Sequence, residues 1–171
     1  MTERARGHPN TAFAVASMGE PLSFSDTMVT STPDLNPIKA FVFCGQGPQH
    51  EHMGVHMYTR FAAFRNSVNA SFEMVAKFHK KNFQDEYGLF NPELNGKVAK
   101  TDKGDWKVEC IVIAITIFQI ALFDLWVDLG VQPDVVLGHS VGEIAAMYAS
   151  GALTHEKAIR TAIARSNALS L

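Results

Sequence analysis

The sequence predicts an α/β fold in which helices pack against a parallel sheet. Two short apolar runs, 39–44 and 135–137, have the length and composition of buried strands. Helical patterns fill much of the stretch between them and the stretch after the second. The second run passes through Gly138-His139-Ser140-Val141-Gly142 directly into helix-forming residues, which is the strand, turn and helix of a nucleophile elbow. Strands that alternate with helices are typical of a parallel sheet.

The chain divides, by composition, near residue 37. Glycine, proline and serine are frequent in 1–37 and no hydrophobic period is sustained there, so this segment is expected to be a linker or a disordered arm. Residues 38–171 are expected to form the folded part. Its first strand, Lys39-Ala40-Phe41-Val42-Phe43-Cys44, is followed by Gly45-Gln46-Gly47-Pro48-Gln49, a loop whose backbone can turn sharply and approach a ligand.

An amphipathic helix is expected over Arg60 to Lys81, because large apolar side chains recur there at spacings of three and four. We interpret them as core contacts; they are Phe61, Phe64, Val68, Phe72, Val75 and Phe78. The pattern fades from Phe83 to Asp105, where four glycines and prolines indicate loops.

A long, mostly buried helix is expected from about Trp106 to Leu129, and Gly130 supplies its stop. Its apolar run ends at Asp124, short of the roughly 20 residues that a bilayer needs, so we read it as a core helix and expect no membrane association. Thr154 is expected to cap a last helix, with His155 on the surface.

Composition narrows the class of protein. The 171 residues carry a formal net charge of -2 with no basic cluster, which argues against nucleic acid as a partner. Cys44 and Cys110 lie far apart without metal-ligand spacing, so a reduced, cytoplasmic protein without a metal is expected and both thiols are interpreted as buried small hydrophobes.

Ser140 is the candidate catalytic residue. In a nucleophile elbow the glycines leave room for a tight reversal, the serine hydroxyl projects from the sheet, and the next N–H, here that of Val141, faces the same space. The N-terminus of the following helix favours an oxyanion nearby. The alternative is a turn of Gly, Ser and Gly that joins a strand to a helix without any chemistry.

Two longer motifs, in this order, resemble the malonyl-CoA:acyl-carrier-protein transacylase family. They are Phe41-Val42-Phe43-Cys44-Gly45-Gln46-Gly47-Pro48-Gln49 and Gly138-His139-Ser140-Val141-Gly142-Glu143-Ile144-Ala145-Ala146, with Phe118-Gln119-Ile120-Ala121-Leu122 between them. Within the family, the residues of these motifs are similar to those of acyltransferase domains of fungal iterative polyketide synthases. The resemblance identifies 38–171 as a partial acyltransferase domain with a hydrolase-like parallel-sheet core, ending before the family's ferredoxin-like subdomain.

The resemblance implies roles for five residues. Ser140 would attack a malonyl-type thioester of CoA and pass the acyl group to the phosphopantetheine thiol of an acyl carrier protein. Gln46 and the Val141 N–H would form the oxyanion hole. His139 would shape the acyl pocket, and Arg165 would pair with the free carboxylate of the acyl group. No bound cofactor is implied; acyl-CoA, the carrier protein and other synthase domains are the expected partners.

The sequence departs from the family in two respects. None of the seven histidines stands at the position of the family's general base, which lies further downstream, and Val112 replaces a common glutamine. The chain is therefore expected to be catalytically incomplete alone. Two other functions remain open: an α/β-hydrolase-type esterase, and a non-catalytic interaction module left by truncation.

Overall fold

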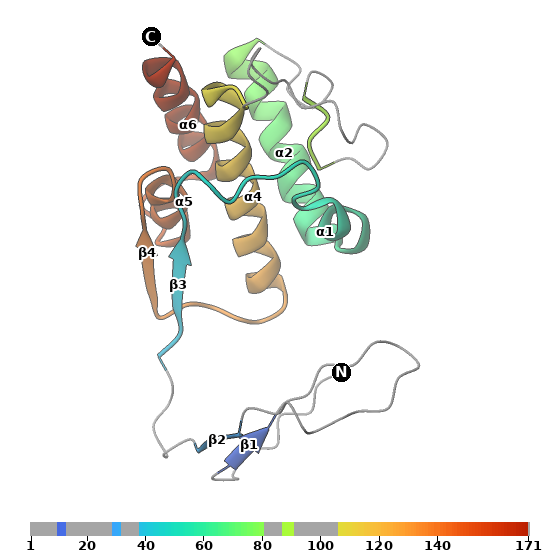
Figure 1. Ribbon diagram of the computed structural model, residues 1–171, viewed down its shortest axis with the longest axis vertical. Coiled ribbons are helices and arrows are strands. Elements are labelled where there is room, and N and C mark those ends of the chain that lie inside the picture. The colour runs from blue at the N-terminus through green and yellow to red at the C-terminus, as the bar shows by residue number, and fades with distance from the viewer. Residues whose placement is uncertain (1–9, 13–28, 32–37, 81–86, 91–105, 171) are drawn as a thin grey trace. The chain divides into compact units, whose positions relative to one another are not determined.

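The computed structural model describes residues 10–12, 29–31, 38–80, 87–90 and 106–170 (Figure 1). The chain separates into two compact units, Met1–Pro37 and Ile38–Leu171. In the first unit, strand β1 (Asn10–Ala12) pairs antiparallel with β2 (Val29–Ser31), so that Asn10 lies opposite Ser31. The sequence pattern predicts no strand in this arm, because strands of three residues are too short to display a period.

The second unit contains the predicted parallel pair of strands. Strand β3 (Ala40–Phe43) lies beside β4 (Val135–Gly138), in a register that places Ala40 opposite Val135. The Asp134 carboxylate fixes the start of this pair, because it accepts from the Lys39 N–H at 2.7 Å and from Lys39 Nζ at 3.0 Å. The first apolar run and the elbow strand are therefore held edge to edge, as expected for an α/β core.

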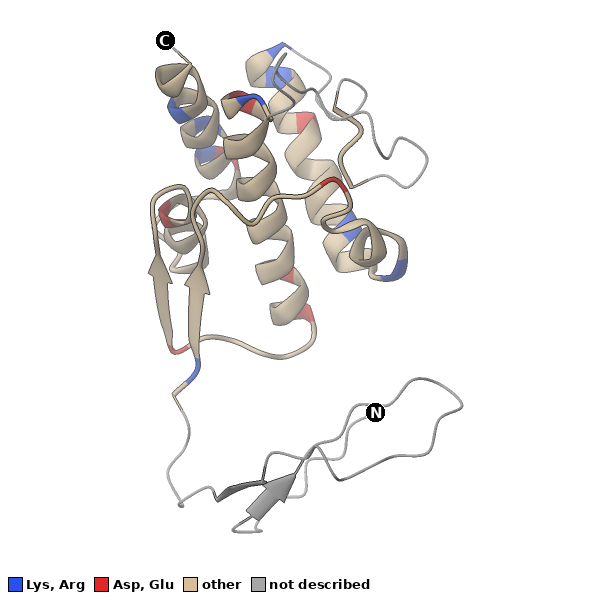
Figure 2. Cartoon of the chain, in the orientation of Figure 1, with Lys and Arg blue, Asp and Glu red and all other residues tan. Residues whose placement is uncertain are grey.

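The described part of the second unit also contains five helices: α1 (Val55–Arg60), α2 (Ala62–His79), α4 (Val108–Asp128), α5 (Gly142–Ala149) and α6 (His155–Leu169). Helix α4 packs against α2, α5 and α6, and α2 also contacts α6 (Figure 1). Cys110 to Phe123 carry no charge, and Figure 2 shows the acidic residues of α4 near its two ends.

Helix α4 is the core helix that the sequence predicts. It is long and apolar enough to cross a membrane, and its most apolar 18-residue segment has a mean hydropathy of 2.3. However, 61% of that segment is buried inside the protein. Its buried side chains pack with α2, α5 and α6. The Gly130 N–H donates to the Val127 carbonyl at 2.9 Å, so the helix ends where the glycine predicts.

The single helix predicted over Arg60 to Lys81 is wrong at its start. Phe61 is extended, with φ -116° and ψ 117°, and separates α1 from α2. Arg65 Nη1 satisfies the carbonyls that the break leaves unpaired, donating to Tyr58 O at 2.9 Å and to Thr59 O at 3.3 Å. Phe61 is 40% exposed and not a core residue, whereas Phe64 is fully buried.

Part of the stretch with no clear pattern belongs to the core. Tyr87, Leu89 and Phe90 are buried, and the Phe90 ring lies 6.4 Å from that of Phe64 and 6.3 Å from that of Phe118. Their burial comes from tertiary contacts with α2 and α4, which a period along the sequence does not reveal. Most of 83–105 lies outside the described residues.

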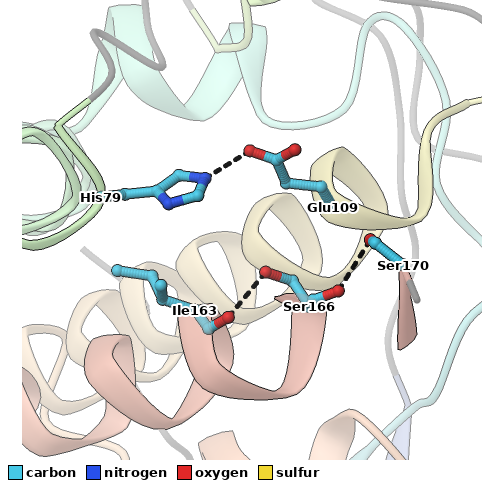
Figure 3. Close-up of polar contacts among 5 residues, drawn as sticks. All are labelled: His79, Glu109, Ile163, Ser166 and Ser170. Carbon is cyan, nitrogen blue, oxygen red and sulfur yellow. Dashed lines mark hydrogen bonds and ion pairs between the residues drawn. The ribbon is translucent and has the colours of Figure 1, made fainter. Parts of the chain in front are cut away.

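Figure 3 shows three polar contacts, one between α2 and α4 and two within α6 and its C-terminal cap. His79 at the end of α2 pairs with Glu109 in the first turn of α4. In α6 the buried Ser166 hydroxyl donates to the Ile163 carbonyl at 2.8 Å, and Ser170 Oγ donates to Ser166 O at 2.8 Å. The bond to the Ile163 carbonyl satisfies the buried hydroxyl of Ser166.

Candidate active site

Ser140 stands at the apex of the turn that joins β4 to α5. Its φ is +53°, in the left-handed region that residues with a side chain rarely adopt. This strained conformation is the signature of a nucleophile elbow, because it lifts the hydroxyl out of the strand. The predicted strand, turn and helix around Ser140 are therefore confirmed.

The turn is tightened by three consecutive backbone hydrogen bonds. The N–H groups of Gly142, Glu143 and Ile144 donate to the carbonyls three residues earlier, at 2.9, 3.1 and 3.2 Å. The Val141 N–H donates to no backbone carbonyl in the described part of the chain. Such a free donor beside the serine is what an oxyanion hole requires.

Glycines allow the first strand and the elbow to approach closely. A Cβ on Gly45 would lie 2.9 Å from His139 Nδ1 and 3.2 Å from the Cβ of Ser140. A Cβ on Gly138 would lie 2.6 Å from the Cα of Glu143. The loop after β3 therefore begins beside the serine, where the family resemblance places it.

Arg165 is the residue that contacts the Ser140 hydroxyl. It projects from α6, and its Nη2 donates to Ser140 Oγ at 3.2 Å. The arginine side chain is 34% exposed, so it borders the site without being sealed from solvent. Residues 25 positions apart in the sequence are thus brought together by the packing of α6 on α5 and α4.

The other predicted site residues lie nearby but make fewer contacts. His139 is exposed, and its N–H donates to the Phe43 carbonyl at 3.0 Å, which continues the strand pairing. The Val141 side chain is fully buried beneath the turn. Gln46 is exposed, one residue beyond Gly45.

Glu143 is the site residue that sequence reasoning missed. Its Oε2 lies 3.8 Å from Arg165 Nη1, so a carboxylate pairs with the same guanidinium that contacts Ser140. Glu143 follows Ser140 by three residues, a spacing that places both side chains on one side of a helix start. That spacing was the available signal, although it does not reveal the partner on α6.

A cavity of about 430 Å³ lies between β3 and α4. Ala40, Val42, Phe118, Leu122 and Trp126 supply apolar lining, and Ser140 is not among the lining residues. Gln119 borders the cavity; its Nε2 donates to the Cys44 carbonyl at 2.8 Å, while its buried Oε1 has no hydrogen-bond partner among the described residues.

The expectation of two buried thiols is wrong for one of them. Cys110 is fully buried, and burial, with Glu109 adding to it, raises the pKa of its thiol to about 12. Cys44 is exposed at the end of β3. Strand alternation explains the difference, because the preceding residue, Phe43, faces the core.

The expectation of a surface His155 is also wrong. The ring is partly buried, its Nε2 lies 2.7 Å from Ser71 Oγ, and its centre lies 5.5 Å from the Tyr148 ring. It is thus part of the contact between α2, α5 and α6.

Among the described residues, no group of three or more His, Cys, Asp or Glu side chains could hold a metal ion.

The comparisons with known proteins agree with this geometry. Residues 40–170 match the family model of the acyl transferase domain, so the chain belongs to this family. It is 37% identical over 139 residues to a highly reducing polyketide synthase of Strobilurus tenacellus, covering 81% of this chain and 5% of that protein. It is 36% identical over 151 residues to a hybrid polyketide and non-ribosomal peptide synthetase of Aspergillus niger, covering 86% and 8%.

Solved structures show the same fold. The acyl transferase domain of ZmaA superposes with a TM-score of 0.70 at 23% identity, over 84% of this chain and 32% of that one. A loading acyltransferase of the avermectin modular polyketide synthase gives 0.63 at 31% identity, over 77% and 38%. The chain thus spans about a third of these structures, and a far smaller share of the curated synthases that it matches.

Proposed function

We propose that this chain is the part of a polyketide or fatty acid synthase acyltransferase that carries the nucleophile and the acyl-carboxylate contact. The proposed reaction transfers a malonyl-type group from CoA to an acyl carrier protein, in the cytoplasm. The observation that carries the proposal is the 3.2 Å contact between Arg165 Nη2 and Ser140 Oγ on a strained elbow. An arginine at a nucleophile suits an acyl group that ends in a carboxylate.

The chemistry follows in two steps. Ser140 Oγ attacks the thioester carbonyl, and collapse of the tetrahedral intermediate expels the CoA thiolate and leaves an acyl-serine ester. The phosphopantetheine thiol of the carrier protein then attacks that ester, so the acyl group moves to sulfur and Ser140 regains its proton. The carbonyl oxygen carries negative charge in both intermediates, and the free Val141 N–H, with Gln46, would stabilise it.

The proton acceptor for Ser140 is not supplied by the described contacts. In the described part of the chain the Ser140 hydroxyl bonds to Arg165, which cannot act as a base. A serine without a base is a weak nucleophile, so we expect slow acylation of this chain and faster acylation of a chain that holds the whole domain. An esterase shares the elbow, but the family match favours acyl transfer.

Intact-mass spectrometry after incubation with malonyl-CoA tests the proposal. The wild-type chain should gain one malonyl group, and Ser140→Ala should gain none. Ser166→Ala is the matched control, since this serine is buried in α6 and its hydroxyl donates to the Ile163 carbonyl of the same helix. Because the isolated chain is expected to react slowly, the same variants are compared in a chain with the whole domain; no Ser140 adduct there would contradict the proposal.

A further inference from the structure

We infer that Glu143 is a positioning residue that holds the Arg165 guanidinium toward Ser140 and so sets the preference for acyl groups with a free carboxylate. The inference rests on the proposed function, because it concerns the same site. It adds a residue for which neither the motif resemblance nor the comparisons give a role.

The two ends of the Arg165 guanidinium have different partners. Nη2 donates to Ser140 Oγ at 3.2 Å, and Nη1 lies 3.8 Å from Glu143 Oε2. An arginine side chain has many rotamers, and one contact alone leaves the planar group free to swing. Two contacts on two nitrogens fix both its position and its plane.

Glu143 is itself tied to the serine. Its N–H donates to the Ser140 carbonyl at 3.1 Å, within the turn that opens α5. Its carboxylate lies in the first turn of that helix, where the helix dipole favours negative charge. Each of the three residues Ser140, Glu143 and Arg165 therefore contacts the other two. The strained turn fixes the position of the Glu143 carboxylate, and the carboxylate fixes the position of the Arg165 guanidinium.

This arrangement leaves donors for a ligand. A guanidinium carries five N–H groups, and the two observed contacts do not use them all. The Glu143 side chain is 59% exposed and its nitrogen-to-oxygen distance is long, so the pair orients the arginine and adds little to stability. In the described part of the chain, Glu143 is the acidic residue paired with Arg165.

The test uses monomethyl malonate, which presents an ester carbonyl and one carboxylate but needs no catalysis to bind. Its dissociation constant, and that of methyl acetate, are measured by NMR titration for the wild type, Glu143→Gln, Glu143→Asp, Arg165→Gln and Glu156→Gln. Glu156 is the matched control, since it also lies in the first turn of a helix and pairs with an arginine, at 3.7 Å.

We expect Glu143→Gln to weaken monomethyl malonate binding by about threefold to tenfold, with methyl acetate binding unchanged. Glu143→Asp should recover part of the loss, Glu156→Gln should match the wild type, and all melting temperatures should agree. Tighter binding by Glu143→Gln would overturn the inference, because it would mean that Glu143 competes with the ligand.

The outcomes separate the inference from the proposed function. If Arg165→Gln loses binding and Glu143→Gln keeps it, the positioning role is overturned while the carboxylate contact of Arg165 stands. If the wild type does not prefer monomethyl malonate to methyl acetate, both the inference and the carboxylate preference in the proposed function are overturned.

Discussion

Gly142 lies against the carbonyl of Phe43, so closely that a Cβ on Gly142 would stand 2.2 Å from that oxygen. The carbonyl of the next residue, Cys44, would be 2.6 Å away. The first strand and the elbow helix thus meet through backbone, and the second glycine of the motif is required by packing as well as by the turn.

Gly142→Ala should therefore destabilise the protein by about 3 kcal/mol or more, since backbone atoms cannot move aside as a flexible side chain would. Gly130→Ala is the control: its φ is +81°, and a Cβ added there would have no described atom within 4 Å beyond its chain neighbours, so only backbone strain of about 1 kcal/mol applies. Urea unfolding of both variants measures the difference. Equal losses would show that β3 and α5 can separate without cost.

The two cysteines should differ in reactivity. Cys44 is exposed, whereas Cys110 is buried with a thiol pKa of about 12, so Cys110 stays protonated at pH 8. A chromogenic disulfide reagent at pH 8 should label one thiol in the native chain and the second only after denaturation.

Cys44→Ser should abolish the native labelling, and Cys110→Ser should leave it intact. Rapid labelling of Cys110 in the Cys44→Ser variant, at a rate independent of denaturant, would show that the α4 interior opens readily.

The features that could be predicted from the sequence are those with local causes. A few adjacent residues determine the strand before Ser140 and the positive φ of its turn. The same is true of the helix cap at Thr154, whose hydroxyl accepts from the Lys157 N–H at 3.3 Å. Helix α4 was also predictable, because a long apolar run ends at charged residues and a glycine.

The features that were missed depend on contacts that a hydrophobic period along the sequence does not reveal. The apolar residues keep their helical spacing across the break at Phe61, so the pattern does not show it. The break is stabilised by Arg65, one turn beyond it. Tyr87 and Phe90 are buried because α2 and α4 cover them, although their own segment has no period. At the site, the resemblance to a family placed Arg165 near the serine, but only the packed helices bring Glu143 to it.

His79 and Glu109 should stabilise the protein as a pair. Both side chains are mostly buried, with 12% and 18% exposed. The Glu109 carboxylate, in the first turn of α4, also matches the dipole of that helix (Figure 3). A double-mutant cycle with His79→Gln and Glu109→Gln should give a coupling free energy of about 1 kcal/mol.

High salt should reduce this coupling only modestly, because the pair is partly shielded from solvent. Additive single losses would contradict the interaction. Glu156→Gln with Arg160→Gln is the exposed control pair, with side chains 48% and 63% exposed, and its coupling should be smaller and lost in salt.

His155 should make the stability depend on pH. Its ring is held by Ser71 at 2.7 Å and lies against Tyr148, whose hydroxyl donates to Asp124 Oδ1 at 2.8 Å. Ser67 Oγ donates to the other oxygen of that carboxylate at 2.6 Å. Burial lowers the pKa of His155, and the Asp124 charge opposes that effect without cancelling it.

The sign follows from proton binding. The unfolded histidine titrates near pH 6.5, above the folded pKa, so the unfolded chain binds more protons in between. The stabilising contribution of neutral His155 is therefore complete above about pH 6.5, falls as the pH drops, and levels off below the folded pKa. Unfolding free energies from urea titrations between pH 7.5 and 5 should show this decline.

His155→Gln should flatten that slope, since glutamine can still contact Ser71 but carries no titrating proton. His56→Gln is the control at an exposed histidine of α1, and it should keep the wild-type slope. A slope that is the same in the wild type and in His155→Gln would show that the contact between α2, α5 and α6 admits the protonated ring, and that the decline comes from other groups.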